Sequence, residues 1–210
     1  EEKGEYTFSF TLPAGGRCRT NVYMQKGSIA LALCLIEAEI PAPEELGIPD
    51  SIVELGQKEN GLVLISGTSG SGKSATLSAI INRINDSREC LIITLENPVE
   101  YLHPCKRAII SQREIGVDCR NQAEGIGAAV RQDADIIVIE ELRDAESACA
   151  AIGAAETGHL VFAVLRAADA VDAVERVLDM FPVSGQERIR ARLSHVLETV
   201  SFQQLLPVPD

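Results

Sequence analysis

Tryptophan is absent from this sequence, aromatic residues are few, and basic residues are outnumbered by acidic ones. Aromatic residues make up only 4% of the chain, so its core must be built from isoleucine, leucine, valine and alanine. The formal net charge of −12 argues against a broad nucleic-acid-binding surface, because such a surface needs a basic face. We therefore expect no nucleic-acid partner.

Long apolar runs are also missing. A membrane span requires roughly 20 apolar residues, and the longest candidate, IALALCLI at 29–36, is far shorter and predicts a buried strand. We expect no direct insertion into a membrane. The six cysteines form no C-x-x-C pair and no zinc-like cluster with histidine, which favours free thiols in a reducing cytosol. The chain begins without methionine and without a signal peptide, so we expect a fragment or a trimmed protein.

The first 40 residues have the pattern of a small β-rich unit. Strict alternation in YTFSFTL places Tyr6, Phe8 and Phe10 on one face of a half-buried strand, and two further strands are expected at 17–25 and 28–37. We expect residues 1–40 to be part of an N-terminal domain. Three prolines mark the linker at 41–60, in which SIVELGQ predicts a short helix.

From residue 61 to 210, continuous apolar runs alternate with helical segments. Strands are expected at 61–66, 90–95, 108–111, 135–140 and 159–165. Helices are expected at 72–86, 121–132 and 144–156, followed by two more. Asp144 is placed to cap its helix, and SGQE at 184–187 has the pattern of a capping box. Apolar strands separated by helices indicate an α/β core with a mostly parallel sheet covered on both faces.

A phosphate-binding loop follows the first strand of this core. The motif G-x-x-x-x-G-K-[ST] is completed by Gly67, Gly72, Lys73 and Ser74, between a predicted strand and a predicted helix. Its backbone N–H groups would surround the phosphates of ATP, Lys73 would reach the β- and γ-phosphates, and Ser74 would bind Mg²⁺. The residues expected to bind nucleotide are Gly67, Thr68, Ser69, Gly70, Ser71, Gly72, Lys73, Ser74 and Ala75.

Acidic residues follow two other predicted strands. Glu140 or Glu141, after DIIVI, could polarise the attacking water, whereas Asp135 starts that strand and is interpreted as structural. Glu96, in TLENPVEY, is expected near the same place, because ligands bind beyond the carboxyl ends of parallel strands. Without the phosphate loop, a solvated strand end would be an equally good interpretation of Glu140 and Glu141, and an ordinary turn around Pro98 would be the preferred interpretation of Glu96.

Together these motifs resemble the secretion and type IV pilus ATPases, and most closely the PilT-type pilus retraction ATPases. The resemblance runs from about Tyr6 to about 207. Beside the phosphate loop it includes LENPVEY at the family's Asp box, SQREIGVD, EELRD at the family's Walker B glutamate, AAETGHLVF at the start of its His box, and the FP pair at 181–182. SQREIGVD favours the retraction branch over the assembly branch.

The resemblance implies a homo-hexameric ring of subunits. Each subunit would join a small α+β, PAS-like N-terminal domain to a RecA-like core, with ATP and Mg²⁺ between them. It further implies Glu96 as a residue for metal or water, Glu141 as the catalytic glutamate and His159 as a sensor of the γ-phosphate. Arg17 and Arg19 match N-terminal arginines that reach the nucleotide. The partners implied are inner-membrane pilus platform proteins, which would hold a cytoplasmic protein at that membrane.

The sequence departs from this family at several positions. Arg166 replaces the second histidine of the His box, Cys34 replaces an arginine, and Asn97 replaces the aspartate after Glu96. Glu140 replaces the glycine before the catalytic glutamate and could weaken ATP binding, and Arg166 could compensate by pairing with Glu140 or with the phosphate. The sequence also stops before the C-terminal helical region that the resemblance implies, so we expect either a trimmed chain or a shortened relative.

The leading hypothesis is therefore an ATP-hydrolysing motor subunit that retracts type IV pili. One alternative is a nucleotide-binding ring subunit that hydrolyses weakly or not at all, and another is an assembly or secretion ATPase of the same superfamily. A phosphoryl-transfer enzyme with a small-molecule acceptor is a further alternative, since phosphate loops also serve kinases.

Overall fold

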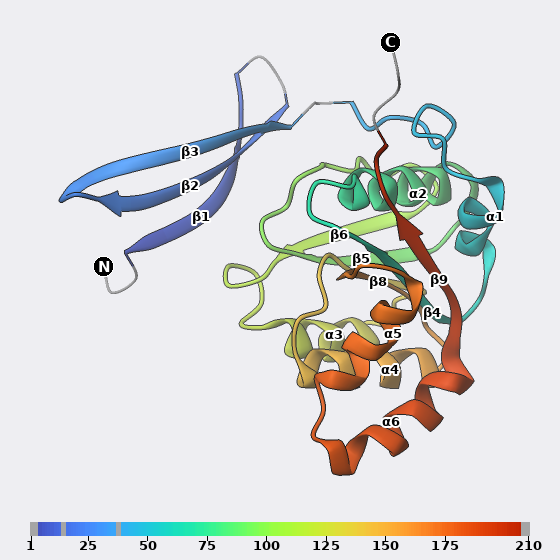
Figure 1. Cartoon of the computed structure of the whole chain (residues 1–210). Coiled ribbons are helices and arrows are strands. Elements are labelled where there is room, and N and C mark those ends of the chain that lie inside the picture. The colour runs from blue at the N-terminus through green and yellow to red at the C-terminus, as the bar shows by residue number, and fades with distance from the viewer. Residues whose placement is uncertain (1–3, 14–15, 37–38, 207–210) are drawn as a thin grey trace.

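The computed structural model describes residues 4–13, 16–36 and 39–206 (Figure 1). Parts of the predicted N-terminal unit and of the chain's end, at 1–3, 14–15, 37–38 and 207–210, lie outside the described residues. The strands are β1 Glu5–Thr11, β2 Arg17–Gln25, β3 Ser28–Ile36, β4 Gly61–Gly67, β5 Leu91–Glu96, β6 Ile109–Glu114, β7 Ile136–Ile139, β8 Leu160–Arg166 and β9 Leu197–Gln203. The helices are α1 Asp50–Val53, the 3₁₀ helix η1 Glu54–Gln57, α2 Lys73–Ser87, α3 Gln122–Arg131, α4 Ala145–Glu156, α5 Ala170–Asp179 and α6 Val183–Val196.

The first three strands form an antiparallel sheet in the order β1-β2-β3. A tight turn at Lys26 and Gly27, both with positive φ, joins β2 to β3 and sets their register. Figure 1 shows this sheet projecting from the rest of the molecule. The three predicted strands are confirmed.

The predicted burial of this sheet is wrong. Ile29, Leu31, Leu33 and Leu35 of β3 are between 60% and 73% exposed, and Tyr6 of β1 is 62% exposed. The apolar residues of β3 share one face of the sheet with those of β1, because Leu31 pairs with Val22 and Val22 pairs with Tyr6. Alternation predicts that one face is apolar, but burial also requires something to lie against it, and the described residues place nothing there.

The core contains a six-stranded sheet in the order β6-β5-β7-β8-β4-β9. Every neighbouring pair in it is parallel, so the carboxyl ends of all six strands lie at one edge. The central strands are continuous runs of apolar residues because both faces of the sheet are covered. The predicted α/β class with a parallel-rich sheet is confirmed.

Helices cover the two faces unequally (Figure 1). Helix α2 packs on one face with η1, where Ile80 and Ile84 meet Val63 and Phe162. Helices α3 to α6 cover the other face. The small side chains of the alanine-rich α4 are buried there, and Ala148 and Ala151 are fully enclosed.

The helix ends agree only partly with the sequence patterns. Asp144 caps α4, since its carboxylate accepts a hydrogen bond from the Ser147 backbone N–H at 2.8 Å. The capping box expected at 184–187 is wrong: α6 starts two residues earlier than that box requires, with Pro182 at its N-cap, and no side chain of the described residues caps it. The apolar face expected for this helix is confirmed, because Ile189, Leu193 and Val196 are buried.

Strand β9 is the one core strand that the apolar runs did not predict. Its residues LETVSFQ are partly buried and pair with β4 at the edge of the sheet. Within the described residues, none of the helices has both the length and the apolar character needed to cross a membrane.

Candidate functional site

The phosphate loop lies at the carboxyl edge of the sheet. It joins the buried β4 to α2, and this confirms the strand–loop–helix context that the motif requires. Gly72 adopts a left-handed conformation with φ of 84° directly before the first residue of α2. A Cβ at Gly67 would lie 2.3 Å from the carbonyl oxygen of Gln203 in β9, so this position requires glycine.

Lys73, the first residue of α2, folds over this loop. Its Nζ donates hydrogen bonds to the carbonyl oxygen of Thr68 at 2.5 Å and to the Ser71 hydroxyl at 3.5 Å. Partial removal from water and the charge of Arg166 lower the pKa of Lys73, while Glu141 opposes the shift. The ammonium group therefore sits where an anion on the loop would gain from it.

An open cleft of about 480 Å³ lies against the loop. It brings together residues from the loop, from the ends of β7 and β8, from the segment after β5 and from the N-terminal sheet. Its polar lining residues are Arg19, Cys34, Ser69, Lys73, Ser74, Asn97, Glu100, Tyr101, Glu140, Glu141, Arg143 and Arg166. Six predicted loop residues line it, namely Ser69, Gly70, Gly72, Lys73, Ser74 and Ala75.

Glu141 is held by two arginines in this cleft. Its Oε2 lies 2.5 Å from Nη2 of Arg143 and accepts from Nε of the same residue at 2.9 Å. Its Oε1 lies 2.6 Å from Nε of Arg166. Both carboxylate oxygens thus have a guanidinium partner.

Glu140 points to different partners. Its Oε2 accepts a hydrogen bond from the Asn97 backbone N–H at 2.5 Å. Burial raises the pKa of Glu140 to about 7, against the effect of that hydrogen bond and with some help from Glu100 and Glu96. The expected pairing of Arg166 with Glu140 is wrong, because the guanidinium of Arg166 reaches Glu141 instead.

Glu96 ends β5 and is largely enclosed. It accepts hydrogen bonds from the Thr94 hydroxyl at 2.5 Å and from Nε2 of Gln112 at 3.0 Å, and burial raises its pKa. Together with Ser74 and Glu140 it lines a small cavity of about 20 Å³ beside the loop. A hydroxyl and carboxylates are the oxygen ligands that Mg²⁺ prefers, so the residues present fit that ion.

The prediction for His159 is wrong in its own subunit. Its neighbour Leu160 pairs with Gly61 at the start of β4, whereas Arg166 pairs with Gly67 at the other end of the same two strands. Six residues of extended strand separate the two ends, which is about 20 Å. His159 therefore lies at the amino edge of the sheet, away from the phosphate loop.

The two N-terminal arginines have different surroundings. Arg19 lines the cleft and pairs with Glu100 at 2.6 Å, which leaves it within the site as predicted from the resemblance. Arg17 does not line the cleft. Its Nε donates to the carbonyl oxygen of Val99 at 2.9 Å and its Nη2 contacts the Ser9 hydroxyl, so it joins the N-terminal sheet to the core.

The sequence analysis missed three residues of this site. Glu100 pairs with Arg19 of the N-terminal sheet, Arg143 pairs with Glu141 two residues before it, and no pattern in the sequence singles out either residue. Gln203 donates from Nε2 to the carbonyl oxygen of Ser71 at 2.6 Å. It belongs to β9, which has no continuous apolar run.

Comparison with known proteins places this geometry in a family. The family model described as "Type II/IV secretion system protein" matches residues 47–208. The uncharacterized protein YggR of Escherichia coli (strain K12) is 44% identical over 204 residues, which cover 97% of this chain and 63% of YggR. The type IV pilus retractation ATPase PilT of Pseudomonas aeruginosa is 37% identical over 206 residues, covering 98% of this chain and 60% of PilT.

A solved structure gives the same result. A crystal structure described as the pilus retraction motor PilT with bound ADP superimposes with a TM-score of 0.91 at 44% identity, over 98% of this chain and 60% of that chain. The chain thus spans less than two thirds of the length of each of these relatives. It belongs to the type II/IV secretion system protein family, and it resembles the PilT-type members of that family over nearly all of its own length.

Proposed function

We propose that this chain is the ATP-binding and ATP-hydrolysing part of a motor that retracts type IV pili. The observation that carries the proposal is that Lys73 of the phosphate loop and the acidic residue Glu141 line one cleft at the carboxyl edge of a parallel sheet. The likeness to a protein named as a retraction ATPase and to a motor structure holding ADP supports it.

The cleft offers a group for each part of the hydrolysis. The loop N–H groups and Lys73 would bind the phosphates, and Arg19 would add positive charge near the terminal one. Ser74, Glu96 and Glu140 would supply ligands for Mg²⁺, which when bound neutralises charge on the phosphates. Glu141 would accept the proton of the attacking water.

The rest of the assembly is proposed on the likeness to the family. Residues 1–40 would be part of the N-terminal domain, 41–60 its linker and 61–210 the nucleotide-binding core. The subunit would work in a homo-hexameric ring in the cytoplasm, held at the inner membrane by pilus platform proteins. An assembly or secretion ATPase of the same superfamily would use the same site.

The test is steady-state ATP hydrolysis with Mg²⁺ over a series of protein concentrations. We expect specific activity to rise with concentration, because ring assembly would complete the site. Lys73→Ala should lower turnover by about 10²–10³-fold through lost charge stabilisation, and Glu141→Gln by about 10²–10⁴-fold through loss of the base. Lys106→Ala, which removes a surface lysine paired with Asp86, is the control and should leave turnover unchanged.

Activity that survives both Lys73→Ala and Glu141→Gln would contradict the proposal, since it would come from another site or another protein. Specific activity that stays constant down to high dilution would contradict the ring. ADP release that depends on an added small-molecule acceptor would point instead to a phosphoryl-transfer enzyme.

One observation favours a second candidate function, a nucleotide-binding ring subunit with little or no hydrolysis. Glu141 has a guanidinium on each oxygen, and these two arginines compete with an attacking water for the carboxylate. ATP would then stabilise the folded protein by mass action. A rise in Tm with ATP that is lost in Lys73→Ala, without measurable turnover in the wild type, would support this candidate over the first.

A further inference from the structure

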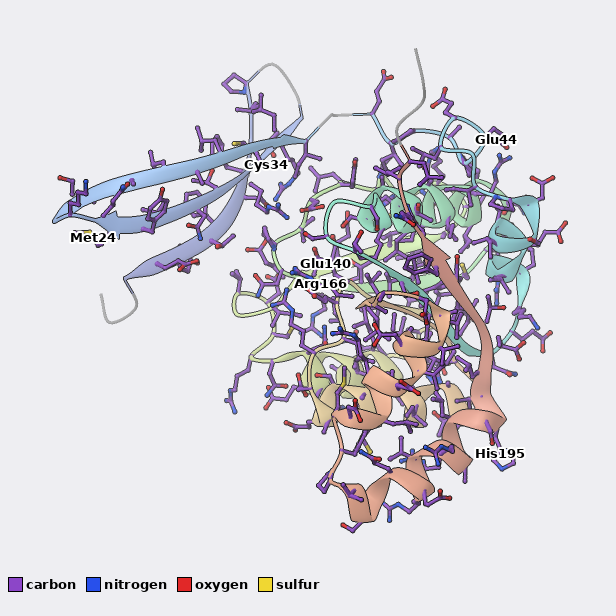
Figure 2. The ribbon with its side chains drawn as sticks, viewed as in Figure 1. Met24, Cys34, Glu44, Glu140, Arg166 and His195 are labelled. Carbon is purple, nitrogen blue, oxygen red and sulfur yellow. The ribbon has the colours of Figure 1, made fainter. Side chains whose placement is uncertain are left out.

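Arg166 occupies a position that touches both the phosphate loop and the acidic end of β7. It is the last residue of β8 and pairs in register with Gly67, the first residue of the loop. The six residues before it in β8 are buried, whereas its own side chain is 60% exposed. Figure 2 shows Arg166 and Glu140 together at this edge of the core, on the side of the N-terminal sheet. The backbone of Arg166 is therefore fixed by the sheet, while its guanidinium lies at the surface of the cleft.

The partner of Arg166 is the proposed base of the reaction. Nε lies 2.6 Å from Oε1 of Glu141 and Nη2 lies 3.4 Å from Oε2. Arg143 occupies Oε2 from the other side. In this arrangement Arg166 competes with an attacking water for Oε1, and Oε1 is a freer proton acceptor once Arg166 has moved away.

The same guanidinium is close to the ammonium group that would grip the phosphates. Both side chains line the same cleft, and their like charges repel each other there. A phosphate placed between them would relieve this repulsion. It would also offer Arg166 a ligand of higher charge than the single carboxylate of Glu141, in a geometry that suits a guanidinium fork.

We propose that Arg166 is a phosphate-operated lock on Glu141, an inference that rests on the proposed binding of ATP in this cleft. Without a terminal phosphate, Arg166 holds Oε1 of Glu141. With the γ-phosphate bound, Arg166 turns to that phosphate and frees Oε1. The oxygen of water then bonds to the γ-phosphorus, its proton passes to Glu141, and the bond from that phosphorus to the bridging oxygen of ADP breaks. The proton leaves Glu141 afterwards with the released phosphate or to solvent.

The test measures binding, so that it does not depend on turnover. The Kd values of ADP and of the non-hydrolysable β,γ-imido analogue of ATP, both with Mg²⁺, are measured by calorimetry. The proteins compared are the wild type, Arg166→Gln, Glu141→Gln and the double variant. Arg176→Ala is the matched control, since Arg176 is a similarly exposed arginine that pairs with Asp172 at 2.9 Å.

Arg166→Gln should weaken binding of the analogue by about 10–100-fold, the value of a charged hydrogen bond, and binding of ADP by less than about twofold. Glu141→Gln should tighten binding of the analogue, because Arg166 no longer has to leave a carboxylate. For the same reason, Arg166→Gln should cost more in the Glu141→Gln background than in the wild type. Arg176→Ala should change neither Kd.

Three results would overturn the lock. Equal effects of Arg166→Gln on ADP and on the analogue would mean that Arg166 does not detect the third phosphate. Additive effects of the two substitutions on the Kd of the analogue would mean that Arg166 does not leave Glu141 when it binds the phosphate. Failure of the wild type to bind either nucleotide would overturn the proposed function together with the lock. If the wild type binds nucleotide without hydrolysing it, the Kd values of the variants still decide whether the lock exists.

Discussion

At the scale of single residues, Glu140 changes the chemistry of the cleft because it places a third acid beside Glu96 and Glu141. Burial raises its pKa from 4.5 to about 7, so near neutral pH it is only partly ionised. Its negative charge, which would repel a γ-phosphate, therefore grows as the pH rises through 7.

This shift also predicts how stability depends on pH. The unfolded chain loses the Glu140 proton near pH 4.5 and the folded chain near pH 7, so between these values the folded state binds more protons. The free energy of unfolding therefore falls as the pH rises from about 4.5 to about 7 and then stays level, by up to about 3 kcal/mol from this group. Glu140→Gln should be about 1–3 kcal/mol more stable than the wild type at pH 8 and nearly equal to it at pH 5.

Urea denaturation at the two pH values measures this difference. Glu187→Gln, at an exposed residue of α6 that pairs with Arg190, is the control and should keep the pH dependence of the wild type. If Glu140→Gln also keeps that dependence, the shift in the pKa of Glu140 does not exist.

The sequence predicted the identity of the site residues better than their partners. Lys73 and Ser74 follow from a motif whose spacing specifies a strand, a loop and a helix. Glu140 and Glu141 follow from their place after an apolar strand, and the resemblance to the family singles out Glu141. The ion pair between Glu141 and Arg166 joins the loop after β7 to β8, and it exists only once these two strands are paired. The error at His159 was avoidable, because a residue that begins a strand lies at the opposite edge from one that ends it.

At the scale of elements, β9 supports the phosphate loop from outside the motif. Gln203 bonds to the carbonyl oxygen of Ser71, and the backbone oxygen of Gln203 closes the space beside Gly67. A strand at the sheet edge therefore helps to hold the loop in the shape that would surround a phosphate.

Gln203→Ala should weaken nucleotide binding about threefold to tenfold and lower stability by about 1 kcal/mol, through loss of one partly buried hydrogen bond. Calorimetry with ADP and Mg²⁺, together with urea denaturation, measures both effects. Gln204→Ala changes the next residue, which is exposed, and should have neither effect. If Gln203→Ala leaves the affinity for ADP unchanged, β9 does not support nucleotide binding by the loop.

Most elements of the core could be predicted because buried parallel strands are continuous apolar runs. Strand β9 could not be predicted, since its polar and apolar residues alternate only weakly and its partial burial depends on pairing with β4. The reverse error occurred at β3, where an apolar run was taken as buried although Leu33 is 61% exposed. In both places, the sequence of the strand itself does not say which part of the protein packs against it.

At the scale of the whole molecule, the N-terminal sheet meets the core at the segment after β5. The Ser9 hydroxyl and Nε of Arg17 both donate to the carbonyl oxygen of Val99, at 2.7 Å and 2.9 Å. Two residues earlier, Asn97 contacts Glu140. The contact between the two sheets is therefore close to the nucleotide cleft.

Arg17→Ala should loosen this contact without unfolding either sheet. We expect amide hydrogen exchange to become about tenfold faster at 97–101 and unchanged at 91–95, since about 1–2 kcal/mol of docking contact is lost. Arg190→Ala, which breaks an exposed ion pair with Glu187 on α6, is the control. Unchanged exchange at 97–101 would show that Arg17 does not hold the sheets together.

The order of strands in the core sheet has a consequence for how the protein is made. β4 appears early in the chain, yet both strands that flank it, β8 and β9, are synthesised much later. Ser71 and Gln203 are 132 residues apart, so a ribosome adding about 5–20 residues per second needs about 7–26 seconds to supply the second after the first. During that interval the nascent chain already carries the whole phosphate-binding motif, but the contact from Gln203 that supports the loop can form only after β9 has been synthesised.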